Sequence, residues 1–479
     1  MSRSGDVINY SLRPRKNIER KILCDIIRSM SYFGRLDEYR YLGFGSFYYQ
    51  DFIMFHKEFS IKEAISFEKD NRGYLKNNDA LDQVLKYLKN RWIDFIEPYY
   101  LDEIDSVVID IKNGSASKED VIESGQLHKL TENIANSITE EIRSIDVRKF
   151  ELNMQKLEIF DFSFVRLANS ISLPLKEVVF LELSNMISNI DELQSIKDEI
   201  ATSEEKDNRD FNDKKGTIIS EIIKMLTEIA TNRYLYNKPY GFIKLSFGEM
   251  QNALNCINWN KGLKNIIWLD YDDFLDNSML DCLEKVVVKS SKGSLIIFSS
   301  SIGNNADERY TKLKENFQET HRIGKKIEKK MCDNKEIFKT VYNIVNNVVR
   351  AAISEKNNYV PDESPQFIYN QVLNCQYTDG TVMYTYAIFI SDNEDNTDDQ
   401  RYPINILKQY EWYTPGEEKF VIDMPVLTGK EINLINCFLP DNNIEAIKKH
   451  LPYVPEAEIK KYLKIYKYYP YYFDAAYCV

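Results

Sequence analysis

The sequence predicts an α/β protein with a mostly parallel sheet, interrupted by a long helical insertion and closed by an antiparallel hairpin. Three observations lead to this fold class. Short, nearly continuous apolar runs at 265–275 and 294–301 are typical of parallel strands buried on both faces. A glycine turn at 43–46 separates a strand-like from a helix-like segment. Asp379-Gly380 separates two β-rich segments, which indicates a hairpin.

The composition is that of a globular protein with more than one domain. The chain has 479 residues, of which 43% are hydrophobic and 28% charged. Its net charge of −12 argues against a protein that coats nucleic acid non-specifically, although a local basic groove remains compatible with it. Four histidines and seven cysteines without a CxxC pair provide no zinc-site spacing, so no zinc site is expected.

We expect a soluble, cytoplasmic protein that does not enter a membrane. The first ten residues lack the apolar core of a signal peptide, and no run of 18 apolar residues occurs. Scattered cysteines in odd number suit reduced thiols in a cytosol.

The first element is a helix over roughly 14–33. Pro14 suits a first helical turn, and apolar residues recur at spacings of three and four. The opposite face is basic and includes Arg13, Lys16 and Arg20. This face is either solvated or covers an anionic substrate or ligand.

A strand at 39–46 then ends in Gly-Phe-Gly-Ser, and a helix follows as far as residue 59. A second strand at 63–70 closes on Glu68. Strand, glycine turn, helix, strand and acid together form the opening of a βαβ unit that binds a dinucleotide or an adenosyl group.

Residues 75–232 have helical patterns and a very polar stretch at 201–216, which predicts an all-α insertion domain. Its amphipathic helices must bury their apolar stripes somewhere. They either form a cap over a cleft or bind a protein partner, which includes a second copy of the chain.

Strands resume after the insertion at 241–249, 265–275 and 294–301, each followed by a helical segment. Strands at 366–377 and 381–392 form the hairpin, and short helices follow residue 426. The predicted domains are a discontinuous Rossmann-like domain (1–74 and 233–425), the helical insertion (75–232) and a helical tail packed on the Rossmann-like domain (426–479).

A parallel sheet with a terminal antiparallel hairpin is the strand inventory of class I S-adenosylmethionine-dependent methyltransferases. Nicotinamide-binding Rossmann domains usually end in a parallel sixth strand, so the hairpin disfavours an oxidoreductase. The segments LRPRKNIERK, YRYLGFGSFYYQDFIMFHKEF, ISFEKD, RYLYNKPYGFIKLSFGE, IIWLDYDDFLD and KIYKYYPYYF resemble a bacterial family described as putative O-methyltransferases.

The resemblance covers about 1–74 and 233–479 and implies S-adenosylmethionine as cofactor and O-methylation of an acceptor that it does not identify. Members often lie beside mobile-element and phage-defence genes. In that family the third strand follows shortly after the second, so the insertion is a departure that can replace or regulate activity. The alternative is therefore a non-catalytic or nucleotide-sensing component of an antiviral or toxin–antitoxin assembly.

The expected cofactor-binding residues follow the first three strands. Gly43, Gly45 and Ser46 would let the backbone approach the ligand beside a helix N-terminus. Glu68 would accept hydrogen bonds from both ribose hydroxyls. The adenine would meet Ser246 and Glu249. A ligand-free tight turn and a solvated acid are the structural alternatives.

The expected catalytic residues lie at the end of the fourth strand, where Asp270 and Asp272 should face the cleft. Either carboxylate could act as general base on a hydroxyl, or hold a divalent metal that lowers the hydroxyl pKa. The motif WLDYDD is not the Asn/Asp-Pro-Pro-Tyr of methyltransferases that act on the amino groups of bases. The acidic cluster could equally precede a helix that begins at Asp276-Asn277.

Overall fold

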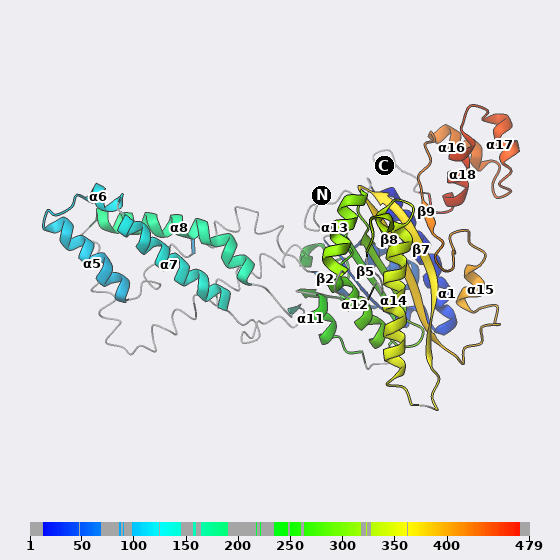
Figure 1. Ribbon diagram of the computed structural model, residues 1–479, viewed down its shortest axis with the longest axis horizontal. Helices are drawn as coiled ribbons and strands as arrows, with labels where there is room; N and C mark the ends of the chain where they lie inside the picture. Colours follow the sequence, from blue (N-terminus) through cyan, green and yellow to red (C-terminus); the bar gives the residue numbers. More distant parts are fainter. Residues whose placement is uncertain are drawn as a thin grey trace. The chain divides into compact units, whose positions relative to one another are not determined.

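The structure is a computed structural model (Figure 1). It describes residues 13–46, 48–68, 86–87, 90, 98–123, 125–144, 157–159, 164–189, 217, 221, 234–247, 250–259, 263–317, 322, 327–361 and 363–469. The chain forms two compact units, Met1–Glu68 with Lys238–Val479 and, separately, Lys69–Asn237. The predicted boundaries at 74/75 and 232/233 lie outside the described residues and stay predictions.

The first unit contains a mixed sheet with strand order β4-β2-β1-β5-β6-β8-β7-β9. The strands are β1 (Arg40–Gly43), β2 (Glu63–Glu68), β4 (Ile243–Phe247), β5 (Asn265–Phe274), β6 (Leu295–Ser301), β7 (Phe367–Asp379), β8 (Thr381–Asp392) and β9 (Phe420–Ile422). Among these described strands, only β8 runs antiparallel to its neighbours, and it lies between β6 and β7. The predicted α/β fold with an antiparallel hairpin is thereby confirmed.

The register joins the two halves of the sequence into one layer. Leu42 of β1 pairs with Ile65 of β2 on one side and with Ile267 of β5 on the other. Beyond β2, Phe67 pairs with Ser246 of β4. The ends of β1, β2, β4 and β5 therefore meet at one edge of the sheet, which is where open α/β sheets bind ligands.

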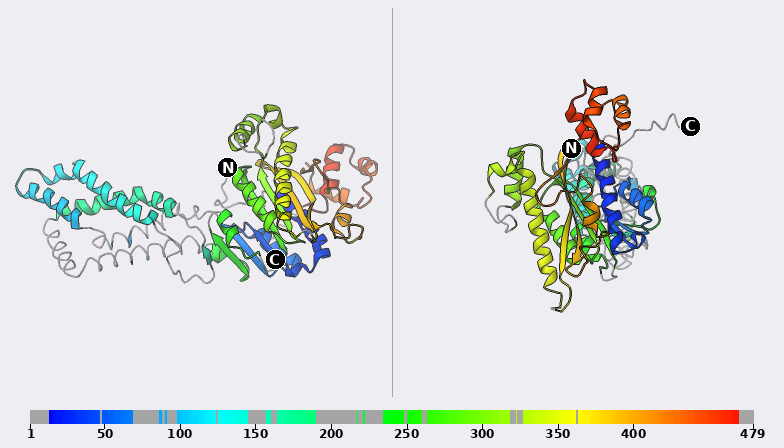
Figure 2. Two further views of the ribbon diagram at one scale, coloured as in Figure 1. Left: turned by 60° about the horizontal axis from the view of Figure 1, so that its bottom comes forward. Right: turned by 90° about the vertical axis from the view of Figure 1, so that its right-hand side faces the viewer.

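Helices cover both faces of this sheet. One face carries α1 (Pro14–Ser29) and α2 (Gln50–Phe59), and the other carries α11 (Met250–Cys256), α12 (Asn277–Lys289) and α14 (Ile337–Asn357). Figure 2 shows α1 in blue and α14 in yellow-green on opposite sides of the strands. Buried residues of α11, α12 and α14 share one large core with Leu42, Ile65, Ile267 and Phe298.

Local signals account for most element ends. Pro14 occupies the first turn of α1, and a 3₁₀ turn (Met30–Phe33) continues the helix as far as Gly34. Asp276 caps α12, since its carboxylate accepts a hydrogen bond from the amide of Met279 at 2.9 Å. The predicted alternative, that the acidic cluster leads into a helix cap, is thus correct for Asp276.

The region after residue 426 forms α16 (Gly429–Asn436), α17 (Ile444–His450) and α18 (Glu456–Ile465). These helices enclose a small apolar core of their own. Beyond α18, the hydroxyl of Tyr468 accepts from Nε1 of Trp412 and donates to Asp25 of α1, at 2.8 and 2.7 Å.

The second unit contains α5 (Pro98–Lys112), α6 (Lys118–Ile122), α7 (Gly125–Ser144), α8 (Phe164–Ser188) and a three-residue strand, β3 (Leu157–Ile159). Helices α7 and α8 pack against each other, which confirms the helical character of the insertion. Ile109, Leu173 and Leu181 expose apolar side chains on this unit. Among the described helices none is long and apolar enough to span a bilayer.

Candidate active site

The turn after β1 needs glycine because neighbouring side chains leave no room for a Cβ. At Gly43 the space is taken by the hydroxyl of Tyr41. At Gly45 a Cβ would lie 2.5 Å from Oγ of Ser66 and 2.6 Å from the ring of Tyr49. Packing within the protein therefore requires glycine at both positions, whether or not a ligand binds beside the turn.

A short hydrogen-bond chain links this turn to Glu68. The amide of Gly45 donates to Oγ of Ser66 at 2.9 Å, and Ser66 donates to Oε1 of Glu68 at 2.7 Å. The Glu68 side chain is buried. The glycine turn and Glu68, both predicted to bind the cofactor, are thus connected through a single serine.

Two serines predicted to contact the cofactor have buried hydroxyls without a hydrogen-bond partner among the residues that the structure describes. Ser46 adopts a left-handed backbone conformation with φ of 49°, and its Oγ makes no hydrogen bond to a described residue. Oγ of Ser246, in β4, is likewise unpaired. Buried polar groups are normally paired, so two unpaired hydroxyls at this edge leave room for an added acceptor or donor. Glu249 lies outside the described residues.

Asp270 lies in the middle of β5 and not at the strand end where it was predicted, since the strand continues to Phe274; its carboxylate is held by Lys16 of α1. Nζ of Lys16 lies 2.6 Å from Oδ1 of Asp270, 2.8 Å from Oε2 of Glu19, and 4.3 Å from the centre of the Trp268 ring. Burial alone would lower the pKa of Lys16, but Asp270 and Glu19 outweigh it and the pKa rises well above its usual value. Burial raises the pKa of Glu19, against the opposing effect of Lys16.

A layer of polar side chains anchors Glu19 beneath this cluster. Thr385 of β8 donates to Oε1 of Glu19. Its Oγ1 lies 2.9 Å from Oγ of Ser299, which accepts from Nε1 of Trp268 at 3.0 Å. Sequence reasoning missed Glu19, Thr385, Ser299 and Trp268. The only signal was the Lys16–Glu19 spacing of three on one helix, which marks a shared face but not a buried one.

Asp272 is exposed near the end of β5. Partial desolvation of its carboxyl by the surrounding protein raises its pKa above the usual value, and the negative charges of Asp273 and Asp270 raise it further. The positive charge of Arg13 partly opposes this increase. A carboxylate with a raised pKa is a better general base near neutral pH than an ordinary aspartate.

The three basic residues predicted to bind an anion lie in different surroundings. Arg13 is half-buried just before α1. Lys16 pairs with Asp270, and Nε of Arg20 donates to the buried carboxylate of Asp51. The heads of Lys16 and Arg20 thus contact acids of the protein itself, and their role toward an external anion stays a prediction.

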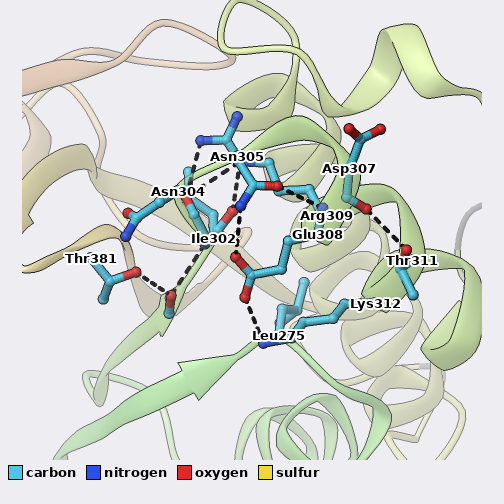
Figure 3. Close-up of polar contacts among 12 residues, drawn as sticks. Leu275, Ile302, Asn304, Asn305, Asp307, Glu308, Arg309, Thr311, Lys312 and Thr381 are labelled. Atoms are coloured by element: carbon cyan, nitrogen blue, oxygen red, sulfur yellow. Dashed lines mark hydrogen bonds and ion pairs between the residues drawn. The ribbon is translucent and has the colours of Figure 1, made fainter. Parts of the chain in front are cut away.

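The loop after β6 completes this edge of the sheet (Figure 3). Asn304 donates to the carbonyl of Gly380 in the hairpin turn and accepts from the amide of Val382, at 3.2 and 3.1 Å. The buried guanidinium of Arg309 donates to the carbonyls of Ile302 and Gly303. These contacts fix the loop beside Asp379, whose side chain accepts from the amide of Lys16.

In the described part of the chain, no group of three His, Cys, Asp or Glu side chains could hold a metal ion. Two surface pockets, of about 380 and 630 Å³, lie along α14 and include none of the predicted site residues. The site at the carboxyl edge is therefore defined by its side chains and hydrogen bonds.

One comparison with known proteins identifies a family. The sequence profile of the family described as putative O-methyltransferase matches residues 8–80 and 221–477, which is more than half of the chain. The unmatched stretch lies within the second unit. No curated protein and no solved structure matches the chain significantly. The chain belongs to the putative O-methyltransferase family, and its family domain is split by the helical insertion.

Proposed function

We propose that the first unit binds S-adenosylmethionine at the carboxyl edge of its sheet and methylates an oxygen atom of an acceptor. The observation that carries this proposal is the chain from Gly45 through Ser66 to Glu68. It holds a buried carboxylate at the end of the second strand, where an adenosyl ribose would need two hydrogen-bond acceptors. Family membership supports the reaction class.

The residues at this edge fit the cofactor in their chemistry. Glu68 would accept from the ribose hydroxyls, while Ser46 and Ser246 would bind its methionine and adenine ends. Their unpaired hydroxyls are the observation that favours a ligand here, since each loses hydrogen bonds to water on burial. Tyr49 and Ser66 fill the space beside Gly45. This glycine would therefore allow the turn to pack closely and would not itself contact the ligand.

When bound, the cofactor would supply an electrophilic methyl group on a sulfonium, with the thioether sulfur as leaving group. The protein must bring an oxygen nucleophile to that carbon and remove the proton of the hydroxyl. Asp272 suits proton removal, because its raised pKa strengthens it as a base and its side chain reaches solvent. Asp270, bound to Lys16, is better placed to orient the site.

Transfer of a tritiated methyl group from S-adenosylmethionine to components of a bacterial lysate would test this function. We expect Asp272→Asn to reduce transfer at least tenfold without weakening cofactor binding, since the amide cannot accept the proton. Because the folded pKa of Asp272 is raised, transfer by the unmodified protein should fall as the pH drops through that value. Asp281→Asn, at an exposed position of α12, serves as matched control. Equal transfer by Asp272→Asn and the unmodified protein would contradict its role as base.

A second candidate function is a cofactor-binding component without catalysis, in which the insertion binds a partner. The ion pair that engages Asp270 and the exposed Leu173 and Leu181 of α8 favour it. Size-exclusion chromatography with light scattering would test self-association, and Leu173→Glu with Leu181→Glu should then yield a smaller species. A monomer in both cases would reject a second copy as partner. The antiviral or toxin–antitoxin context stays a prediction from the resemblance.

A further inference from the structure

A pocket of about 630 Å³ opens where α12 and α14 end and β7 begins. This is the edge of the sheet opposite to the candidate active site. Its apolar wall consists of Val288, Val360 and Phe367, and the exposed ring of Tyr359 lies beside them. A cavity of this size with an apolar wall fits the body of a small organic molecule.

The charged groups at this pocket differ in how far they are already paired. The carboxylates of Asp281 and Glu284 share the guanidinium of Arg322, whose Nη2 lies 2.5 and 3.2 Å from them. Glu355 is exposed and adds one negative charge. Three lysines also line the pocket, and no carboxylate of a described residue lies within ion-pair distance of any of them: Lys285, Lys289 and Lys356. With Arg322 included, these groups leave a net positive charge.

Lys356 is a fixed cation in this pocket. Its Nζ donates to the carbonyl oxygens of Val288 and Ser290, both at 2.8 Å, and lies 4.3 Å from the centre of the Phe367 ring. Carbonyl oxygens at the end of a helix and the face of an aromatic ring both stabilise an ammonium ion. Because these contacts take up its N–H groups, Lys356 adds positive charge to the pocket and is not a free hydrogen-bond donor.

Lys289, in the last turn of α12, is the cation that can meet a ligand directly. Its side chain is exposed and makes no hydrogen bond or ion pair within the described part of the chain. Burial, followed by the positive charge of Lys289, lowers the pKa of Lys356 to about 8, so the two ammonium groups repel each other at neutral pH. An anion paired with Lys289 would offset this repulsion.

We propose that this pocket binds a small organic anion with an apolar body, of the class of aromatic or aliphatic carboxylates. Lys289 pairs with the carboxylate, Lys356 supports it with a second positive charge, and the body packs on Val288, Val360 and Phe367. Because an exposed ion pair contributes little by itself, the apolar wall supplies most of the affinity and the lysines supply the preference for an anion. The proposal is independent of the methyltransferase function.

Photolabelling of the full-length protein tests this site. The probe is 4-benzoylbenzoate, an aromatic carboxylate whose excited ketone inserts into nearby C–H bonds, and peptide mass spectrometry locates the label. The control is 4-benzoylbenzamide, which has the same shape and no charge. We expect the acid to label peptides that contain Val288, Val360 or Phe367 half-maximally at an at least fivefold lower concentration than the amide. Equal concentrations, or labelling by the acid without enrichment in these peptides, would overturn the proposal.

Two variants at one position test the role of the charge. Lys289→Gln should raise the half-maximal concentration of 4-benzoylbenzoate about threefold and leave that of 4-benzoylbenzamide unchanged. Lys289→Arg keeps the positive charge and should label as the unmodified protein does. Lys408→Gln, at an exposed lysine outside the pocket, is the matched control. An equal change for both probes in Lys289→Gln, or no change for either, would contradict the pairing of Lys289 with the anion.

Discussion

Buried charge is the distinguishing feature of the site at the scale of single residues. Lys16 lies between two acids, and Arg20 meets Asp51, in a layer where water is excluded. Charges in such places are retained only when they are paired, because the desolvation cost of each ion is several kcal/mol. The basic face of α1 thus attaches this helix to β5. The sequence alone is equally compatible with a basic face exposed to solvent.

Removal of the Lys16 charge should destabilise the first unit strongly. Lys16→Met leaves Asp270 and the fully buried Glu19 without their cation, which we expect to lower the free energy of unfolding by about 3–5 kcal/mol. Urea denaturation measures the change. Lys57→Met, on the exposed side of α2, is the matched control and should change stability by less than about 0.5 kcal/mol.

The destabilisation should depend on pH. Burial already raises the folded pKa of Glu19 above its unfolded value, and loss of Lys16 raises it further. An acid with a raised folded pKa favours the folded state at low pH and loses this contribution as the pH rises through the folded pKa. The difference between Lys16→Met and the unmodified protein should therefore be smaller at pH 5.5 than at pH 8. A difference that grows toward pH 5.5 would contradict the buried-acid assignment.

The glycine turn gives a second prediction at this scale. Gly45→Ala places a methyl group against Ser66 and the ring of Tyr49, so we expect a loss of roughly 1–3 kcal/mol in urea denaturation. At Gly241 an added Cβ meets nothing within 4 Å, so Gly241→Ala should be close to neutral. Equal stabilities of the two variants would show that the turn relaxes freely.

Sequence reasoning predicted the position of some of these residues but not their partners. The glycine turn and Glu68 could be predicted because each is recognised from a short local motif. Their proximity could be predicted because the carboxyl ends of parallel strands lie at the same edge of a sheet. By contrast, Thr385 meets Glu19 across 366 positions of the chain, and Lys16 meets Asp270 across 254. No periodicity within one element reports such a pair, which becomes visible only when α1 is placed on the sheet.

At the scale of elements, side chains from outside α12 satisfy backbone groups at both of its ends. Its first turn follows the acidic end of β5, and its last carbonyls accept from Lys356. Asp276→Ala removes the N-cap and should cost about 1 kcal/mol of stability in urea denaturation. Asp276→Asn, which keeps a side-chain acceptor, should retain most of it, and an equal loss for both would contradict the capping role.

Element types followed from pattern more reliably than their pairing. The Asp379-Gly380 turn signal between two β-rich segments predicted the hairpin, and the apolar runs predicted β5 and β6. The strand β9 was missed, because three residues carry no period and it pairs with Cys375–Tyr377, far back along the chain. Tertiary context alone creates such a strand.

At the scale of the whole molecule, one domain is encoded in two stretches of sequence. The family profile covers residues on both sides of the insertion, and the sheet joins them through the β2–β4 and β1–β5 pairs. Each unit is compact and packs mainly against itself. A long insertion at a crossover between two strands is therefore compatible with the fold, because lengthening such a connection costs little free energy. The role of the insertion follows from neither the family nor the sheet.

Isothermal titration of the full-length protein with S-adenosylmethionine tests the central claim most directly. We expect binding with a dissociation constant in the micromolar range, on the order of −8 kcal/mol. Glu68→Gln should weaken it at least tenfold, because charge-assisted hydrogen bonds are each worth about 1.5–3 kcal/mol. Glu63→Gln, at the opposite end of the same strand, should bind normally. Absence of binding, or equal affinity of the two variants, would contradict the account.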